Sequence, residues 1–331
     1  MEARVAASLP PAGNWQFEPK WDGFRCLVFK GDGEIRLQSK SGQPLERYFP
    51  EIVARVRAMK PSRFVLDGEL VVPDGKYLSF DDLLQRIHPA ASRVARLAAE
   101  HPAALVLFDL LDDGTTVLAH EPLVDRRARL ETFFAAYGVD GMYLSPATRD
   151  RAQAVRWLSG AGGALDGVIA KVADAPYGSG TRDAMIKVKN RRTADCVAGG
   201  FRYASGAPVV GSLLLGLYDE AGLLHHVGFT SSFKAADKPA LTATVKTLEK
   251  APGFTGRAPG GPSRWSTERS SEWVPLEASL VVEVEYDHFS QSRFRHGTKF
   301  MRWRPDKLPR HCTFDQVAGK GTPAAKWLQV L

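Results

Sequence analysis

The character of the chain changes near residue 192, and this change limits what it can fold into. Before it, β-prone runs alternate with stretches whose apolar residues recur at helical spacing, as in 45–56. After it, short β-prone runs such as 211–217 dominate, with one helical stretch among them. A length of 331 residues suits two domains that each bury a core. We therefore expect an α+β domain over residues 1–192 and a short-strand β-barrel with one helix over residues 193–331.

Charge and cysteine content exclude several classes of protein. The chain has 44 Lys and Arg against 37 Asp and Glu, a net charge of +7 that suits an anionic partner without requiring one. Cys26, Cys196 and Cys312 are far apart, so we expect no disulfide framework, no four-cysteine zinc site and a reducing compartment. No apolar run approaches the roughly 18 residues of a membrane helix, and no secretion signal precedes Gly13. We expect a soluble, cytoplasmic protein.

The segment Lys20-Trp-Asp-Gly-Phe-Arg25 lies at the junction of two β-prone runs. A lysine in a tight turn beside an aspartate and an arginine could act as a covalent nucleophile. Its pKa, about 10.4 in water, would have to be lowered by neighbouring positive charge or by desolvation. A solvated turn lysine is the alternative, and six residues alone favour it.

Two acidic segments stand at the ends of apolar strands. Asp67 and Glu69 are two positions apart, so both side chains point to one strand face. Such a pair suits a hydrated divalent cation or a ribose hydroxyl, although a strand-ending turn explains it equally well. Asp166 precedes a second buried run, which ends at Lys171.

Two basic segments follow. Lys187 and Lys189 alternate with apolar residues and share a strand face, where they repel each other unless they face a polyphosphate or solvent. Arg302-Trp-Arg-Pro-Asp-Lys307 lies near the carboxyl end and could also be a charged edge segment.

The order and spacing of these segments resemble the motifs of the covalent nucleotidyltransferases, the superfamily of ligases and capping enzymes. The series runs through Lys20, Asp67 and Glu69, Asp109, Asp166, Lys187 and Lys189, and Arg304, Asp306 and Lys307. The sequence from Glu18 to Arg25 resembles that of the small ATP-dependent DNA ligases of bacteria, the LigC type. The resemblance implies an α+β fold, in which a nucleotidyltransferase domain of ATP-grasp-like antiparallel sheets with helices precedes an OB-fold β-barrel.

The resemblance also implies roles for residues around a bound nucleotide. Lys20 would attack the α-phosphate of ATP, release pyrophosphate and hold AMP through a phosphoramide bond. Arg25 and Glu69 would contact the ribose and Glu18 the adenine edge. Phe108 matches the aromatic residue that stacks on adenine, although it could equally be core.

Further basic residues would bind phosphate. Lys187 and Lys189 would bind the α-phosphate and lower the pKa of Lys20 by proximity of positive charge. Arg182 could hold phosphate as well, and Lys40 replaces an arginine that clamps phosphate in relatives, without the bidentate fork of that arginine. Arg304 and Lys307 would reach the β- and γ-phosphates.

We expect Asp67, Glu69 and Asp166 to bind Mg²⁺ or Mn²⁺; many relatives have Glu in place of Asp166. The resemblance implies a monomeric, ATP-dependent enzyme that seals 3′-OH/5′-phosphate nicks in duplex DNA through lysyl-AMP and DNA-adenylate. It would act in DNA repair, associated with the bacterial nucleoid. An RNA ligase or another polynucleotide nucleotidyltransferase is the alternative. The intact Lys20 argues against an inactive nucleic-acid-binding module, and three cysteines cannot supply the zinc module of an NAD-dependent ligase.

Overall fold

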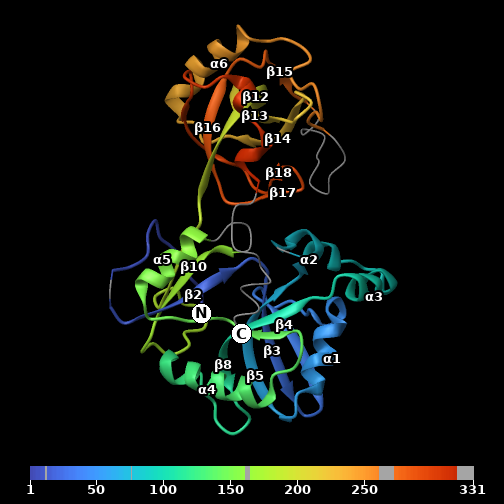
Figure 1. Cartoon of the computed structure of the whole chain (residues 1–331), viewed down its shortest axis with the longest axis vertical. Coiled ribbons are helices and arrows are strands. Elements are labelled where there is room, and N and C mark those ends of the chain that lie inside the picture. The colour runs from blue at the N-terminus through green and yellow to red at the C-terminus, as the bar shows by residue number, and fades with distance from the viewer. Residues whose placement is uncertain (12, 76, 161–164, 261–271, 319–331) are drawn as a thin grey trace. The chain divides into compact units, whose positions relative to one another are not determined.

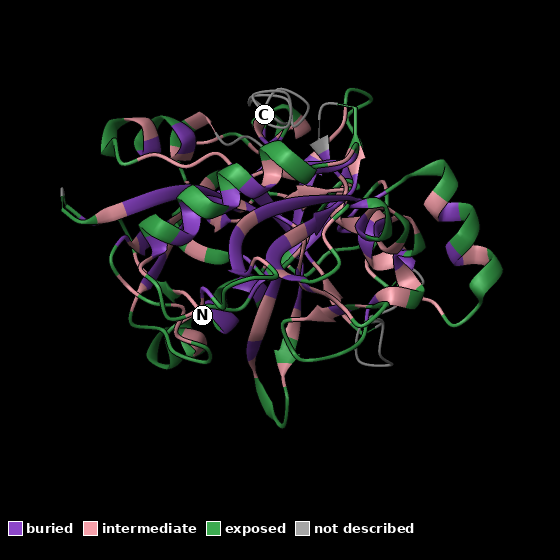
Figure 2. Cartoon of the chain, turned by 90° about the horizontal axis from the view of Figure 1, so that it is seen from below, coloured by how far each residue is buried: buried purple, intermediate pink, exposed green. Residues whose placement is uncertain are grey.

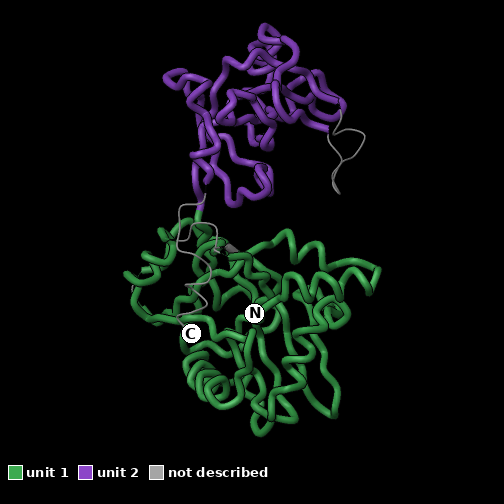
Figure 3. Tube along the Cα trace, turned by 45° about the vertical axis from the view of Figure 1, so that its right-hand side comes forward, with its two compact units in different colours: residues 1–190, 320–331 green, residues 191–319 purple. Residues whose placement is uncertain are grey.

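The computed structural model in Figure 1 describes residues 1–11, 13–75, 77–160, 165–260 and 272–318. The chain divides into two compact units, the first spanning Met1–Asn190 and the second beginning at Arg191 (Figure 3). Burial is concentrated on the strands, whereas the helices turn exposed faces outward (Figure 2). No helix within the described ranges is long and apolar enough to cross a membrane.

One sheet of the first unit has the strand order β4-β3-β5-β8-β9. Its neighbours are antiparallel except for β8 and β9, which run parallel. These strands are β3 (Phe24–Gly31), β4 (Glu34–Ser39), β5 (Phe64–Val71), β8 (Ala104–Asp112) and β9 (Met142–Leu144).

Successive side chains of a strand point to opposite faces, and this alternation gives the sheet two buried faces. Leu105 and Leu107 pack in one cluster with Ile52 and Leu130, which come from helices α1 (Pro50–Ala58) and α4 (Leu123–Tyr137). Val106 packs instead with Trp21 and Leu165 of the second sheet. The face that carries Val106 is therefore the one that meets the second sheet.

The second sheet has the order β1-β11-β10-β2. Val168 and Ala170 of β10 pack with Ala154 and Trp157 of helix α5, so the alternate residues Ile169 and Lys171 face away from this helix. The elements are β1 (Arg4–Val5), β2 (Trp15–Trp21), α5 (Arg151–Gly160), β10 (Leu165–Val172) and β11 (Met185–Lys189).

The helical periodicity of 45–56 is only partly realised as α-helix. A 3₁₀ turn at Glu46–Tyr48 comes first, and α1 begins at Pro50, whose missing N–H costs nothing at a first helical position. In helix α2 the Ser79 side chain caps the amino end by accepting from the Asp82 amide at 3.2 Å. The remaining elements are β6 (Pro73–Asp74), β7 (Tyr77–Leu78), α2 (Phe80–Arg86) and α3 (Ala91–Glu100).

The second unit is built on a sheet of order β14-β13-β12-β16-β19, with β15 also paired to β12. Its strands are β12 (Arg192–Ala204), β13 (Ala207–Tyr218), β14 (Leu224–Thr230), β15 (Val274–Pro275), β16 (Val281–Tyr286) and β19 (Lys299–Trp303). Also present are the hairpin β17 (Phe289–Ser290) and β18 (Arg293–Phe294), helix α6 (Lys238–Lys246), and 3₁₀ turns at Ala235–Asp237, Pro309–His311 and Phe314–Gln316.

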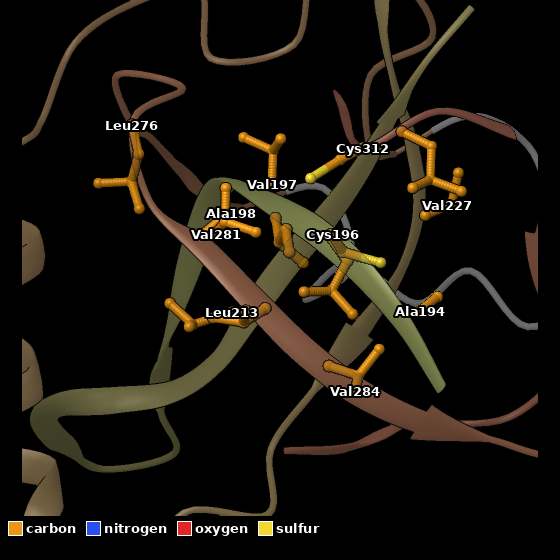
Figure 4. Packing of buried hydrophobic residues seen from close by; sticks show 14 of the residues in the cluster. Ala194, Cys196, Val197, Ala198, Leu213, Val227, Leu276, Val281, Val284 and Cys312 are labelled. Atoms are coloured by element: carbon orange, nitrogen blue, oxygen red, sulfur yellow. The ribbon is translucent and has the colours of Figure 1, made fainter. Parts of the chain in front are cut away.

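The core of this unit draws on both faces of the sheet, since consecutive residues of β12 and of β13 are buried in it. Figure 4 shows Cys196, Leu213, Val284 and Cys312 among the residues of this core, and all four are buried. The edge strands β14 and β19 share no ladder among the described residues, and one isolated bridge from Thr230 joins the segment just before β19. In place of the expected continuous barrel, the structure has a strongly curved sheet whose two edge strands meet at a single bridge.

Candidate active site

A cavity of about 210 Å³ lies between the two sheets of the first unit. Strands β2, β3, β5, β8, β10 and β11 supply most of its lining. The predicted site residues that line it are Glu18, Lys20, Arg25, Lys40, Asp67, Glu69, Phe108 and Lys187. Segments far apart in the sequence thus converge on one cavity because the two sheets face each other.

Lys20 lies near the end of β2, beside β10. Its ammonium group contacts the carboxylate of Asp166, and the other oxygen of this carboxylate lies 3.7 Å from Nζ of Lys189. Gly167 allows the close approach of β10 and β11: its φ is +146°, and a β carbon there would lie 2.0 Å from the carbonyl oxygen of Val188. The chain geometry therefore holds a carboxylate against Lys20.

The ionisation of Lys20 differs from the sequence expectation. Burial lowers the pKa of its ammonium, but the adjacent Asp166 carboxylate, together with Glu69 and Asp22, outweighs this effect and raises the pKa above its usual value. The pKa of Lys187 is lowered by desolvation and then by the positive charge of Lys20 and neighbouring lysines. The net shift of the Lys20 pKa is therefore upward, opposite to the lowering expected from Lys187 and Lys189, because the closest charge to Lys20 is negative.

One end of the cavity contains a buried carboxylate held at both oxygens. Glu18 is 2% exposed; it accepts a hydrogen bond from Gln16 at 2.8 Å, and its other oxygen lies 2.8 Å from Nζ of Lys171. The Lys171 ammonium also lies 4.6 Å from the ring centroid of Phe108, within cation–π range. Lys171 is a site residue that was not predicted, although its position two residues after Ile169 puts both on the cavity face of β10.

Asp67 is paired with Arg25 in a way that the sequence did not predict. Its carboxylate, fully buried, accepts from Nε of Arg25 at 3.1 Å and from Nη2 at 2.6 Å, and the hydroxyl of Tyr177 donates to it at 2.8 Å. A bidentate guanidinium partner occupies the oxygens that a cation would need. The geometry therefore favours a positioning role for Asp67 over the expected metal-ligand role.

The other acidic residues give limited support for a metal site. Glu69 is half-buried, and burial raises its pKa to about 8 even though Lys20 and Arg25 act in the opposite direction. Within the described part of the chain, no group of three or more His, Cys, Asp or Glu side chains is arranged to hold a metal ion. Asp166 remains the carboxylate nearest to Lys20.

Two predicted phosphate-binding residues share one acidic partner at the edge of the cavity. A carboxylate oxygen of Glu2 lies 3.5 Å from Nζ of Lys40, and its other oxygen lies 3.0 Å from Arg182. Both cations are exposed, so solvent screens these pairs.

The basic residues predicted near the carboxyl end cluster around Asp195 in the second unit. Nη1 of Arg304 donates to both oxygens of Asp195 at 2.8 and 3.0 Å, and Lys307 lies 3.6 Å from the same carboxylate. Arg304 also donates to Asp306 and holds its pKa at about 2, well below the usual value. No local pattern marks Asp195 as their partner, because Asp195 lies on β12 whereas Arg304 and Lys307 follow β19.

Comparisons with known proteins agree with this architecture. Residues 7–189 match the family described as the ATP dependent DNA ligase domain, and residues 206–307 match the ATP dependent DNA ligase C terminal region. The chain belongs to the ATP-dependent DNA ligase family. Its first unit is the nucleotidyltransferase domain, and its second contains the C-terminal region typical of these ligases.

The relatives include ligases of similar length. The chain is 44% identical to DNA ligase C2 of Mycolicibacterium smegmatis, over 96% of this chain and 93% of that protein. It is 41% identical to DNA ligase C of Mycobacterium tuberculosis, over 96% of this chain and 92% of that protein. A solved structure from a study of Lig E DNA ligases, 16% identical, covers 92% of this chain and 100% of its own with a TM-score of 0.52, and so supports the fold. This chain is an ATP-dependent DNA ligase similar to the mycobacterial ligase C proteins.

Proposed function

We propose that this ligase seals nicks in duplex DNA through an AMP group carried on Lys20. The observation that carries the proposal is the position of Lys20, which lies near the end of β2 and lines a cavity together with Glu18, Phe108 and Lys187. A base can lie at the Glu18 end while its phosphates lie near the lysines of β2 and β11. The similarity to the ligase C proteins supports a DNA ligase over an RNA ligase or another polynucleotide nucleotidyltransferase.

The first step forms a bond between Nζ of Lys20 and the α-phosphorus of ATP and breaks the bond to pyrophosphate. Lys20 must lose a proton before it attacks, and Asp166 is the carboxylate in contact with that proton. Lys187 and Lys189 supply positive charge on the side where negative charge develops. In the second unit, Arg304 and Lys307 are the groups we assign to the leaving pyrophosphate.

The adenine end gives a physical reason for a preference for ATP. The Glu18 carboxylate is an acceptor that suits the 6-amino group of adenine and repels the 6-oxo group of guanine. Gln16 and Lys171 hold this carboxylate in one orientation.

Members of this family use a divalent metal together with ATP. We propose Mg²⁺ or Mn²⁺, which would neutralise phosphate charge as lysine attacks. Asp166 and Glu69 are the carboxylates that could hold it, since Asp67 is engaged by Arg25.

In the later steps AMP passes from Lys20 to the 5′-phosphate of a nick, and the 3′-hydroxyl then displaces AMP. We propose a monomer that acts in DNA repair in the bacterial cytoplasm, at the nucleoid. The net charge of +7 suits a DNA partner. The three cysteines are free and buried, as suits a reducing compartment.

The test is labelling with α-labelled ATP, GTP and NAD in parallel, followed by sealing of nicked duplexes with DNA or RNA on either side of the nick. We expect an adduct from ATP, none with Lys20→Ala, and sealing of the DNA nick. Lys60→Ala, which changes an exposed lysine, is the matched control and should leave both reactions unchanged. An AMP adduct that persists in Lys20→Ala, or an adduct from GTP alone, would overturn the proposal.

A further inference from the structure

Tyr177 lies on the segment between β10 and β11 and lines the cavity beside Arg25 and Asp67. Its backbone amide donates to the carbonyl of Ala119 at 2.8 Å. This hydrogen bond holds the segment against the loop that joins β8 to helix α4. The guanidinium of Arg126 lies 5.7 Å from the centroid of the Tyr177 ring. Arg126 is itself fully buried and is fixed by both oxygens of Asp109, at 2.8 and 2.9 Å.

The Tyr177 hydroxyl completes a triangle of hydrogen bonds. It accepts from Nη2 of Arg25 at 3.0 Å and donates to Oδ2 of Asp67 at 2.8 Å, while Nη2 of Arg25 donates to the same oxygen at 2.6 Å. Desolvation, together with the charge of Asp67, raises the pKa of this phenol, so the hydroxyl remains protonated and able to donate. Each member of the triangle therefore restricts the other two.

The hydrogen-bond donors of Arg25 show how the triangle limits the orientation of its guanidinium. A guanidinium has five N–H donors. Nε donates a hydrogen bond to Asp67, Nη2 donates to Asp67 and Tyr177, and Nη1 donates to the carbonyl of Met1. Among the described residues, these contacts leave one N–H of Nη1 for a ligand in the cavity. Without the Tyr177 oxygen, Arg25 would have a second free donor, on Nη2, and the guanidinium could tilt.

We propose that Tyr177 is a positioning residue that orients Arg25 toward the nucleotide ribose. This inference rests on the proposed function, in which Arg25 contacts the ribose of ATP. Tyr177 itself touches no reacting atom, and its effect passes through Arg25 and Asp67. Loss of its hydroxyl should therefore weaken binding of a nucleotide that carries ribose hydroxyls and leave the chemical step unchanged.

The experiment measures single-turnover formation of the AMP adduct on the full chain as a function of nucleotide concentration, with ATP and with 2′,3′-dideoxy-ATP. For Tyr177→Phe we expect the half-saturating ATP concentration to rise about 10-fold, as for loss of one hydrogen bond to a charged group. The maximal rate should be unchanged, and the value for dideoxy-ATP should change less than about 2-fold. Tyr137→Phe removes an oxygen from a more exposed tyrosine that does not line the cavity and should have no effect.

The comparison of two nucleotides in one variant separates positioning from folding, because a folding defect weakens both equally. Equal losses with ATP and dideoxy-ATP, or no loss with ATP, would overturn the inference. In an Arg25→Gln background, Tyr177→Phe should add no further loss, and an additive loss would also overturn it. Failure of the proposed function is distinguishable, since wild-type protein would then form no adduct on Lys20.

Discussion

Replacing Asp166 by Asn tests the electrostatic control of Lys20. Asn keeps the shape of the side chain and removes its charge, so Lys20 loses the partner that stabilises its ammonium form. The burial of Lys20 remains and favours the neutral amine. The pKa of Lys20 should therefore fall, and a larger fraction of the lysine should be neutral at a given pH.

The structure bounds the size of this effect. The side chains are 23% exposed for Lys20 and 5% exposed for Asp166, so solvent screens the pair only in part. Two unit charges about 4 Å apart interact by about 4 kcal/mol at an effective dielectric constant of about 20. We discount this for the solvent contact of Lys20 to about 1.5–3 kcal/mol. That free energy corresponds to a roughly 10- to 100-fold larger fraction of neutral lysine below its pKa.

The assay is the pH dependence of single-turnover AMP transfer to Lys20 at saturating ATP. The rate should rise with pH and level off, and Asp166→Asn should level off at lower pH than wild type. Relative to its own plateau, the variant rate at pH 7 should be at least about 10-fold higher. Asp166→Glu keeps the charge and is the matched control, with the wild-type profile expected. A plateau that stays in place or moves to higher pH in Asp166→Asn would refute this account, whatever happens to the plateau rate.

Three further predictions concern the framework of the site. Arg126→Met should lower the free energy of unfolding by about 3–5 kcal/mol, because the buried carboxylate that it pairs with loses its partner. Arg129→Met, at a side chain 58% exposed, should cost less than about 1 kcal/mol, so equal losses in urea unfolding would contradict the argument. Gly167→Ala should cost at least about 2 kcal/mol and impair AMP transfer, since φ is +146° and the new methyl group would meet the carbonyl of Val188; an unchanged Tm would count against it. Burial raises the pKa of Glu69 to about 8, so its contribution to stability is present below about pH 4.5 and is lost as pH rises toward 8. The Tm of wild type minus that of Glu69→Gln should therefore fall from pH 5 to pH 9, and a constant difference would show that Glu69 does not titrate in this way.

Many of the site residues could be predicted because they lie in recognisable local sequence patterns. Lys20, Glu69 and Lys187 each lie on a short β-prone run, and alternation along a strand gives the face to which they point. The cavity brings these residues together. The family and the α+β class followed from the order of such segments and are confirmed by the comparisons.

The partners of these residues could not be predicted in the same way. Arg25 meets Asp67 across 42 positions of sequence and Tyr177 across 152 positions. Tyr177 is an ordinary tyrosine in its local context, and nothing in spacing or composition distinguishes it from Tyr137. Lys171 was visible as the end of the Asp166 segment, but its pairing with Glu18 depends on the register of β10 against β2.

The sequence by itself determined which chemical groups are present, on which strands they lie and to which family the chain belongs. Tertiary structure alone decided which charged group lies next to each of these residues. Asp166 pairs with Lys20, Arg25 with Asp67, and Lys171 with Glu18. The physical reason is that ionisation and ligand preference depend on the few ångströms around a group. Those neighbours come from other strands, and their identity is fixed only when the two sheets pack face to face.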